Sequence, residues 1–290
     1  MKKIGTYIAL GILYTLSVLP MWVLHRLADV LYVFLYYIFG YRKKVVQTNL
    51  EKSFPEKSPQ EINAIAKASY KHLADLIVES LKGFTISEKE MRRRFTATNI
   101  DLLDKYHNQN RNIIIVTAHY NSWEWAGMSM GLHIKFKNFG MYKPVSDKVM
   151  ERALLKSRQK FGLEMYPMKD TAAYFERYKN QYTLTAFVAD QTPSNLEMAY
   201  WTTFLNQDTP FFRGPERHAI PSNSVIFYVD IQKLGRSRYN ANFELMFEEP
   251  TQTKENEITE AYVRRLEEIL KADPRYWLWT HKRWKKKRSL

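Results

Sequence analysis

Apolar residues dominate the first forty positions of the chain. From Ile4 to Leu24 there is no charged residue, and a run of this length predicts a helix that can cross about 30 Å of hydrocarbon. A second apolar stretch, Leu27 to Gly40, contains Asp29 and is short for a span. We expect this second stretch to be re-entrant, interfacial or packed on the rest of the protein. The alternative is a buried helical hairpin in a soluble protein.

The first apolar run lacks the shorter apolar region and the small-residue cleavage site of a signal peptide, so we expect it to be retained. The basic residues Arg42, Lys43 and Lys44 follow the second stretch. Positive charge next to an apolar segment favours the cytoplasmic side, which predicts that the rest of the chain is cytoplasmic. We therefore divide the chain into an N-terminal membrane anchor, residues 1–44, and a second domain, residues 45–290.

The second domain alternates between helical and strand patterns. Ser58 is a predicted N-cap, and apolar residues recur at helical spacing over 59–83. A β-branched run at 112–118 predicts a buried strand, and a helix is expected at 123–132. Further strands are predicted at 184–188 and 224–231, and further helices near 147–161, 170–179 and 257–271. This alternation predicts an α/β fold, a layered mixed sheet flanked by helices, preceded by an N-terminal hydrophobic membrane helix.

The amino-acid composition excludes some kinds of catalytic group and favours some classes of partner. Lys and Arg outnumber Asp and Glu by 44 to 30, and the formal charge of +14 favours anionic partners such as lipid headgroups, nucleic acid or an acidic carrier protein. The absence of cysteine excludes a thiolate nucleophile, a disulfide framework and Cys-ligated metal sites. The basic run 282–288 is expected to lie against anionic lipid or to be a solvated tail. Three tryptophans are expected to be interface anchors or core residues: Trp277, Trp279 and Trp284.

One pair of residues has the spacing of a general base with its orienting acid. His119 follows the predicted strand and Glu124 begins the next helix. A carboxylate there can reach back to one imidazole nitrogen, fix the tautomer and leave the other nitrogen facing a substrate hydroxyl. The pair lies where α/β sheets open their ligand crevices. A structural histidine remains the alternative.

Four segments in chain order resemble a known family. They are the basic stretch Arg42 to Leu50 with Ser53-Phe54-Pro55, the motif of His119 and Glu124, Ala189-Asp190-Gln191 joined to Thr209 through Ala219, and Trp277 through Lys285. Together they resemble the late acyltransferases of lipid A biosynthesis, the lauroyl and myristoyl transferases of Gram-negative bacteria, over nearly the whole chain. The sequence departs from the family at Lys143-Pro144, where Arg before Pro is common, and at Ser122, where Gly or Asn is common.

The resemblance implies an activity and a fold like that of glycerolipid acyltransferases. A fatty acyl group would pass from acyl carrier protein, or from acyl-CoA, to a hydroxyl of a lipid A precursor, with no metal or cofactor. His119 would take the hydroxyl proton and Glu124 would hold its ring. The residues 45–290 would then be the catalytic domain, on the cytoplasmic side of the bacterial inner membrane.

Further side chains are candidates for substrate contact. Lys143, Arg213 and Arg217 suit the phosphates of the acceptor. Arg213, or backbone amides near Gly214, could also donate to the tetrahedral oxyanion. Asp190 and Gln191 would contact substrate or act as buried polar supports.

Two other functions also fit the sequence. An acyltransferase that acts on a glycerophospholipid, lysolipid or aminolipid would use the same His-plus-acid device. A non-catalytic basic protein, either a membrane scaffold or a nucleic-acid-binding protein, would also fit the charge. The apolar run Ile4 to Leu24 is unexpected in a nucleic-acid-binding protein, and we expect no nucleic-acid partner.

Overall fold

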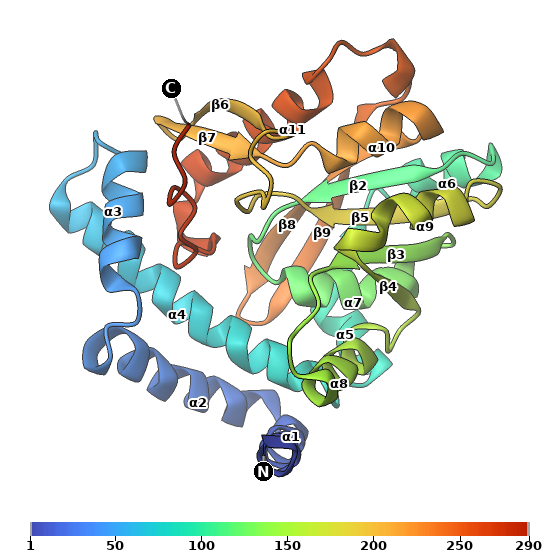
Figure 1. The fold of residues 1–290 in the computed structure, drawn as a ribbon. Helices are drawn as coiled ribbons and strands as arrows, with labels where there is room; N and C mark the ends of the chain where they lie inside the picture. Colours follow the sequence, from blue (N-terminus) through green and yellow to red (C-terminus); the bar gives the residue numbers. More distant parts are fainter. Residues whose placement is uncertain (1, 289–290) are drawn as a thin grey trace.

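The computed structural model describes residues 2–288 and has the predicted α/β architecture (Figure 1). Within these residues the strands form a seven-stranded sheet and a two-stranded ribbon. Across the sheet the order is β1 (Phe95–Thr98), β9 (Arg238–Phe247), β8 (Val225–Gly235), β2 (Ile113–Thr117), β5 (Thr183–Val188), β3 (Lys137–Tyr142) and β4 (Leu163–Pro167). The ribbon pairs β6 (Tyr200–Phe204) with β7 (Gln207–Phe211).

The sheet is mixed because one hairpin reverses its direction. Strands β8, β2, β5, β3 and β4 are parallel to one another, whereas β9 runs antiparallel to β8 and parallel to β1. At the centre, Ile114 and Val116 of β2 enter one apolar core, and Ile113 and Ile115 enter the other. The β-branched run therefore forms a strand buried on both faces, as the sequence predicts.

Helices cover both faces of the sheet (Figure 1). Side chains of three helices enter the core with Ile113 and Ile115: α5 (Glu88–Arg94), α6 (Ile100–Asn108) and α7 (Trp123–His133). Helix α8 (Lys148–Arg158) packs on α7 and β4. Three more helices enter the opposite core: α9 (Thr171–Arg177), α10 (Gly214–Ser222) and α11 (Glu257–Ala272). The single turns η2 (Met168–Asp170), η3 (Pro250–Gln252) and η4 (Pro274–Tyr276) connect these elements.

Helix α4 (Pro59–Gly83) is the long helix that joins the two cores. Its first half contributes Ile62 and Tyr70 to one core, and its second half contributes Ala74 and Val78 to the other. The predicted N-cap is confirmed, because the Ser58 hydroxyl accepts the N–H of Glu61 and the Glu61 carboxylate accepts the N–H of Ser58. The short helix α3 (Lys43–Ser53) precedes it and packs on it.

The N-terminal apolar run does not form one continuous helix, so the predicted span Ile4–Leu24 is wrong. Helix α1 (Lys2–Val18) ends just before Pro20, and α2 (Met21–Val33) begins after it and continues into the π-turn η1 (Phe34–Ile38). Proline has no N–H to donate and disfavours a helical residue before it, which explains the break. Among the described residues, the helix long and apolar enough to cross a membrane is Met21–Ile38.

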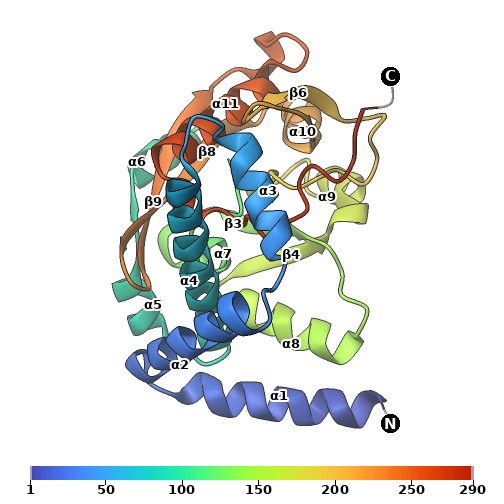
Figure 2. The ribbon, with the colours of Figure 1, turned by 90° about the vertical axis from the view of Figure 1, so that its left-hand side faces the viewer.

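Helices α1 and α2 lie beside α4 at one end of the molecule (Figure 2). They pack on the domain along one side and expose apolar side chains on the other. Met21, Leu24 and Ala28 of α2 are buried in the same core as the second half of α4. The opposite side exposes a set of large apolar residues: Ile4, Tyr7, Ile8, Ile12, Trp22, Val30, Phe34, Tyr37, Ile38 and Phe39. So many exposed apolar side chains on neighbouring helices indicate contact with a membrane or a partner.

Candidate active site

The parallel register of β2 and β5 brings two polar residues together. Thr117 pairs with Val188, and His119 and Asp190 each lie two residues beyond that pair at the carboxyl edge of the sheet. The His119 Nδ1 lies 2.6 Å from Asp190 Oδ1, and the backbone N–H of His119 donates to the same oxygen at 3.0 Å. With Nδ1–H donating to a carboxylate, Nε2 is the basic nitrogen of the ring.

Asp190 is held as a buried carboxylate. Its side chain is 3% exposed, and the indole Nε1 of Trp277 donates to Oδ2 at 2.7 Å. Burial raises the pKa of Asp190, but the adjacent His119 and the hydrogen bonds from His119 and Trp277 outweigh this and hold the pKa at about 2. The ionised form is therefore present at neutral pH and can stabilise positive charge on the imidazole.

The predicted hydrogen bond between Glu124 and His119 is not present in the part of the chain that the structure describes, so this prediction is wrong. Both oxygens of Glu124 accept from Arg158, the last residue of α8, with Nε–Oε2 and Nη2–Oε1 distances of 2.8 and 2.6 Å. Glu124 lies in the first turn of α7 and faces α8, whereas Asp190 occupies the ring nitrogen assigned to Glu124. Within residues 2–288 no hydrogen bond joins Glu124 to His119. Trp123 lies between them in sequence, and its ring is 5.0 Å from the His119 ring, centroid to centroid.

The C-terminal segment covers the pair. The N–H of Leu278 donates to the carbonyl of His119 at 3.2 Å, and Tyr120 forms a β-bridge with Trp277. Trp277 and Trp279 are buried with their rings 4.8 Å apart, so they are core residues and not interface anchors. Trp284 also packs on this core, and its Nε1 donates to Thr209 Oγ1.

The basic run 282–288 is not a uniformly solvated or lipid-facing tail. Arg283 is 1% exposed, and its Nη2 donates to the carbonyl of Pro210 at 2.6 Å while its guanidinium lies over the Phe211 ring. Burial lowers the pKa of Arg283 to about 10, although Asp190 opposes this shift. Lys282, Lys285, Lys287 and Arg288 are the exposed residues of this run, and Trp284 and Lys286 are half-buried.

The other predicted site residues lie in different surroundings. Lys143 is exposed directly after β3, at the same carboxyl edge as His119, and Gln191 follows Asp190 with its side chain half-buried. Arg213 donates to Glu255 at 2.9 Å, so the proposed oxyanion donor already has a carboxylate partner. Arg217 is exposed, and its Nη1 lies 3.6 Å from the sulfur of Met198. Within the described residues, no hydrogen bond or ion pair joins either arginine to the His119–Asp190 pair.

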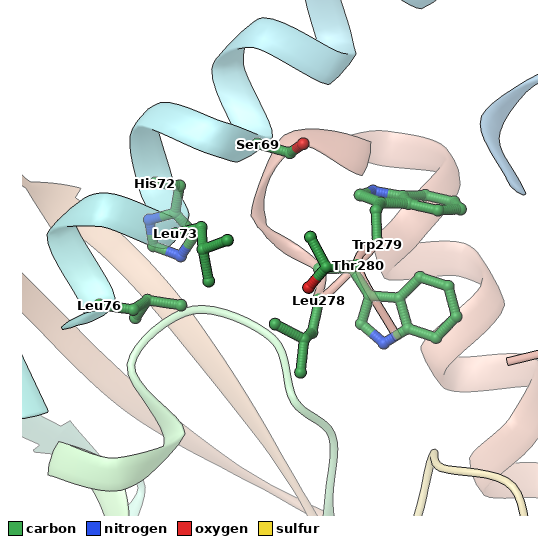
Figure 3. A pocket seen from close by; sticks show the side chains of 8 residues that line it. Ser69, His72, Leu73, Leu76, Leu278, Trp279 and Thr280 are labelled. Atoms are coloured by element: carbon green, nitrogen blue, oxygen red, sulfur yellow. The ribbon is translucent and has the colours of Figure 1, made fainter. Parts of the chain in front are cut away.

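Two pockets lie along α4. A pocket of about 10 Å³, the size of one water molecule, lies between α4 and the segment 277–280. Figure 3 shows His72 and Leu76 of α4 on one side of it and Leu278 and Thr280 on the other. A groove of about 510 Å³ opens between four helices and is apolar apart from Ser80; its lining is Leu13, Leu16, Leu27, Leu31, Ile77, Val78, Ser80, Leu81, Phe84 and Leu154.

Two hydrogen-bond partners in the site, Arg158 and Trp277, are not predicted from the sequence. Arg158 falls inside a predicted helix, and no local spacing links it to Glu124. Trp277 is predicted as an anchor or a core residue, but not as a donor to Asp190. The position of Asp190 two residues past a predicted strand is a signal that strand register could have used. Among the described residues, no group of three or more His, Asp and Glu side chains could hold a metal ion.

Comparison with known proteins gives one consistent result. The family model described as bacterial lipid A biosynthesis acyltransferase matches residues 1–286. The chain is 24% identical over 283 residues to the lipid A biosynthesis palmitoleoyltransferase of Escherichia coli K12, covering 97% of this chain and 90% of that protein. The same values hold for a lipid A biosynthesis acyltransferase of Shigella flexneri. Identity to the lipid A biosynthesis lauroyltransferase of E. coli K12 is 22% over 174 residues, 60% of this chain and 56% of that protein.

Proposed function

Because the chain belongs to the bacterial lipid A biosynthesis acyltransferases, we propose that it moves a fatty acyl group from a carrier-protein thioester to a hydroxyl of a lipid A precursor. The protein is thus an acyltransferase with an acyl donor and a lipid A precursor as acceptor. The observation that carries the proposed mechanism is the 2.6 Å contact between His119 Nδ1 and the buried Asp190 carboxylate. Acyl-CoA is the alternative donor, and the acyloxyacyl ester is the proposed product.

In the proposed reaction His119 Nε2 takes the proton of the acceptor hydroxyl. The oxygen then forms a bond to the thioester carbonyl carbon, and the carbon–sulfur bond breaks as the tetrahedral intermediate collapses. The leaving thiolate takes the proton back from His119. Asp190 keeps Nδ1 protonated and stabilises the imidazolium, since its own carboxyl stays ionised.

We propose that Glu124 belongs to the site but orients Arg158 instead of His119. Its two oxygens hold Nε and Nη2 of Arg158, in the bidentate geometry that fixes a guanidinium most firmly. We propose that the oriented Arg158 donates from Nη1 to the developing oxyanion. Glu124 would then act through Arg158 and not through the histidine ring.

The remaining candidates are proposed as acceptor contacts. Lys143 and Gln191 suit this role best, because both follow strands that end at the same edge as β2. Arg213 would first have to exchange its Glu255 partner for a phosphate, and exposed Arg217 would bind a phosphate as a surface charge.

Membrane attachment is proposed to involve residues 1–44, with residues 45–290 as the catalytic domain. The exposed apolar side of α1, α2 and η1 supports an anchor in the inner membrane. The basic residues Arg42, Lys43 and Lys44 favour the cytoplasmic side for the catalytic domain.

The apolar groove is proposed to hold the acyl chain of the donor. Its volume of about 510 Å³ lies within the usual range of small-molecule sites. Leu154 of its lining lies one helical turn before Arg158, which places the proposed oxyanion donor on the same helix as the groove wall.

The test is an acyl-transfer assay with membranes that contain the wild-type protein or His119→Ala. A lipid A precursor is incubated with acyl carrier protein thioesters or acyl-CoA, and the product is weighed by mass spectrometry. One added acyl mass that disappears in the variant supports the proposal. Acylation of a glycerophospholipid, lysolipid or aminolipid with an unmodified precursor would refute the acceptor. Salt-dependent binding to DNA without any transfer would refute the assignment as an enzyme.

A further inference from the structure

A buried carboxylate outside the proposed reaction collects hydrogen bonds from three elements. Glu79 of α4 is 1% exposed. The hydroxyl of Ser122 donates to Oε2 at 2.7 Å, and the hydroxyls of Ser237 and Tyr239 each donate to Oε1 at 2.8 Å. These partners come from the loop after His119, the turn between β8 and β9, and β9 itself.

The bond to Ser122 replaces a helix cap. Ser122 occupies the N-cap position of α7, where a serine hydroxyl usually accepts a backbone N–H and stabilises the helix. Here its side chain makes no capping hydrogen bond and donates to Glu79 instead. The indole of Trp125 adds a second tie, because its Nε1 donates to the backbone carbonyl of Glu79 at 2.9 Å. Two residues of the segment 119–125 are therefore bound to one residue of α4.

The loop after His119 turns through an uncommon backbone conformation that neighbouring elements hold in place. Asn121 has a φ of 53°, in the left-handed region that few residues other than glycine and asparagine enter. Its Nδ2 donates to the carbonyl of Ile231 at 2.6 Å, and its N–H donates to the carbonyl of Tyr276 at 3.0 Å. Contacts from neighbouring elements thus hold the loop, and Glu79 supplies the contact at Ser122.

The other oxygen of Glu79 connects to the N-terminal helices. Ser237 Oγ also lies 2.9 Å from Nε2 of His25 in α2. The neighbouring Arg236 binds Asp75 of α4 and Asp29 of α2, both at 2.7 Å. One hairpin turn therefore ties α2 and α4 together beside the carboxylate that holds the loop.

From this geometry we infer that Glu79 is a positioning residue for acyl transfer, which acts through Ser122 to fix the loop that carries His119. The inference rests on the proposed role of His119 as the base. The contribution of Glu79 to the stability of the fold does not by itself explain why a carboxyl group occupies this position. Burial raises the pKa of Glu79 to about 7 although the three hydroxyls lower it, and a buried carboxyl adds little to stability when desolvation dominates.

Ser122→Ala and Tyr239→Phe form a matched pair, because each removes one hydroxyl from Glu79 but only Ser122 belongs to the loop. The purified full-length protein in detergent is compared for kcat, KM and thermal midpoint. We expect Ser122→Ala to lower kcat by about ten- to a hundredfold, as misplacement by an ångström can do, with KM changed less than about threefold. Tyr239→Phe should keep kcat within about threefold of wild type.

Glu79 is tested directly by two further variants. Glu79→Gln keeps the shape and a hydrogen bond to Ser122 and should retain most of the activity. Glu79→Leu should lose as much kcat as Ser122→Ala, and the double variant should be no worse than either single variant, because both remove the same contact. Should Glu79→Leu fail to fold, the matched pair still decides the question.

The assay includes His119→Ala, so that the two proposals can fail separately. Full activity of His119→Ala would remove the proposed base, whatever Glu79 does. An inactive His119→Ala together with wild-type kcat in Ser122→Ala would overturn the positioning role. Equal losses of kcat in Ser122→Ala and Tyr239→Phe, in step with lowered thermal midpoints, would overturn it as well, since they indicate a merely structural network.

Discussion

Replacement of Asp190 by asparagine tests the charge and the geometry behind His119 together. Two N–H groups of His119 converge on Oδ1, at 2.6 and 3.0 Å, and the indole N–H of Trp277 donates to Oδ2 at 2.7 Å. An asparagine offers one acceptor oxygen and one NH2 group. Whichever way the amide is turned, its NH2 faces a donor that the carboxylate now accepts.

The size of the effect follows from that mismatch. With the amide oxygen on Trp277, the NH2 group faces Nδ1 and favours the tautomer with hydrogen on Nε2, which removes the basic nitrogen. An Asp-to-Asn change of this kind in a serine protease triad lowers kcat by about 10⁴-fold. With the oxygen on His119, a buried donor pair remains unsatisfied, at about 1–3 kcal/mol. We expect Asp190→Asn to lower kcat by about 10²- to 10⁴-fold.

The assay is steady-state acyl transfer with purified protein, with folding checked by near-ultraviolet circular dichroism. Asp208→Asn is the matched control, because it makes the same chemical change at an exposed position of β7 and should leave kcat unchanged. A folded Asp190→Asn variant with kcat within about threefold of wild type would show that His119 does not depend on the Asp190 carboxylate.

Three further predictions follow from the site. Glu124→Gln and Arg158→Gln should each lower kcat/KM at least about tenfold in the same assay, and the double variant should have the kcat/KM of the worse single variant. A double variant whose loss of kcat/KM is the product of the two single losses would show that the residues act independently. Asp190 has a pKa of about 2 in the folded protein, against an ordinary value of 3.8. Because the pKa is lower in the folded state, the ionised carboxylate stabilises the fold at pH values above the pKa of the unfolded state. About 2 kcal/mol of the free energy of unfolding should therefore be lost as the pH falls from about 4 to about 2. Urea unfolding of the wild-type protein that shows no such loss relative to Asp190→Asn would contradict this. Leu154→Trp should shift donor preference toward shorter chains if the groove holds the acyl chain, and an unchanged preference by mass spectrometry would place that chain elsewhere.

Much of the fold follows from local pattern. The capping box at Ser58, the β-branched run at 112–118 and the helix 257–271 each carry a strong periodic or capping signal, and each is confirmed within about a residue. Strand β3 (Lys137–Tyr142) carries no such signal, since it contains Lys, Asn and Gly and is buried by its neighbours in the sheet. Tertiary context makes it a strand.

The hydrogen-bond partners in the site also depend on tertiary structure and could not be predicted from local sequence. His119 stands out in the sequence because it follows a buried strand, and that position is a local property. Its true hydrogen-bond partner comes from the neighbouring strand 71 residues later, and only the register of β2 with β5 shows this. Proximity in sequence assigns Glu124 to the histidine, whereas a helix start turns it toward Arg158. Sequence spacing could not reveal either pairing.

The proposed mechanism requires Asp190 to fix His119 with hydrogen on Nδ1 and a bare Nε2. Nitrogen-15 NMR of the histidine-labelled protein in detergent, at neutral pH and with His119→Ala for assignment, measures this tautomer directly. We expect a protonated Nδ1 for His119, and loss of that signal in Asp190→Asn. A His119 ring that carries its hydrogen on Nε2 in the wild-type protein would contradict the proposed mechanism.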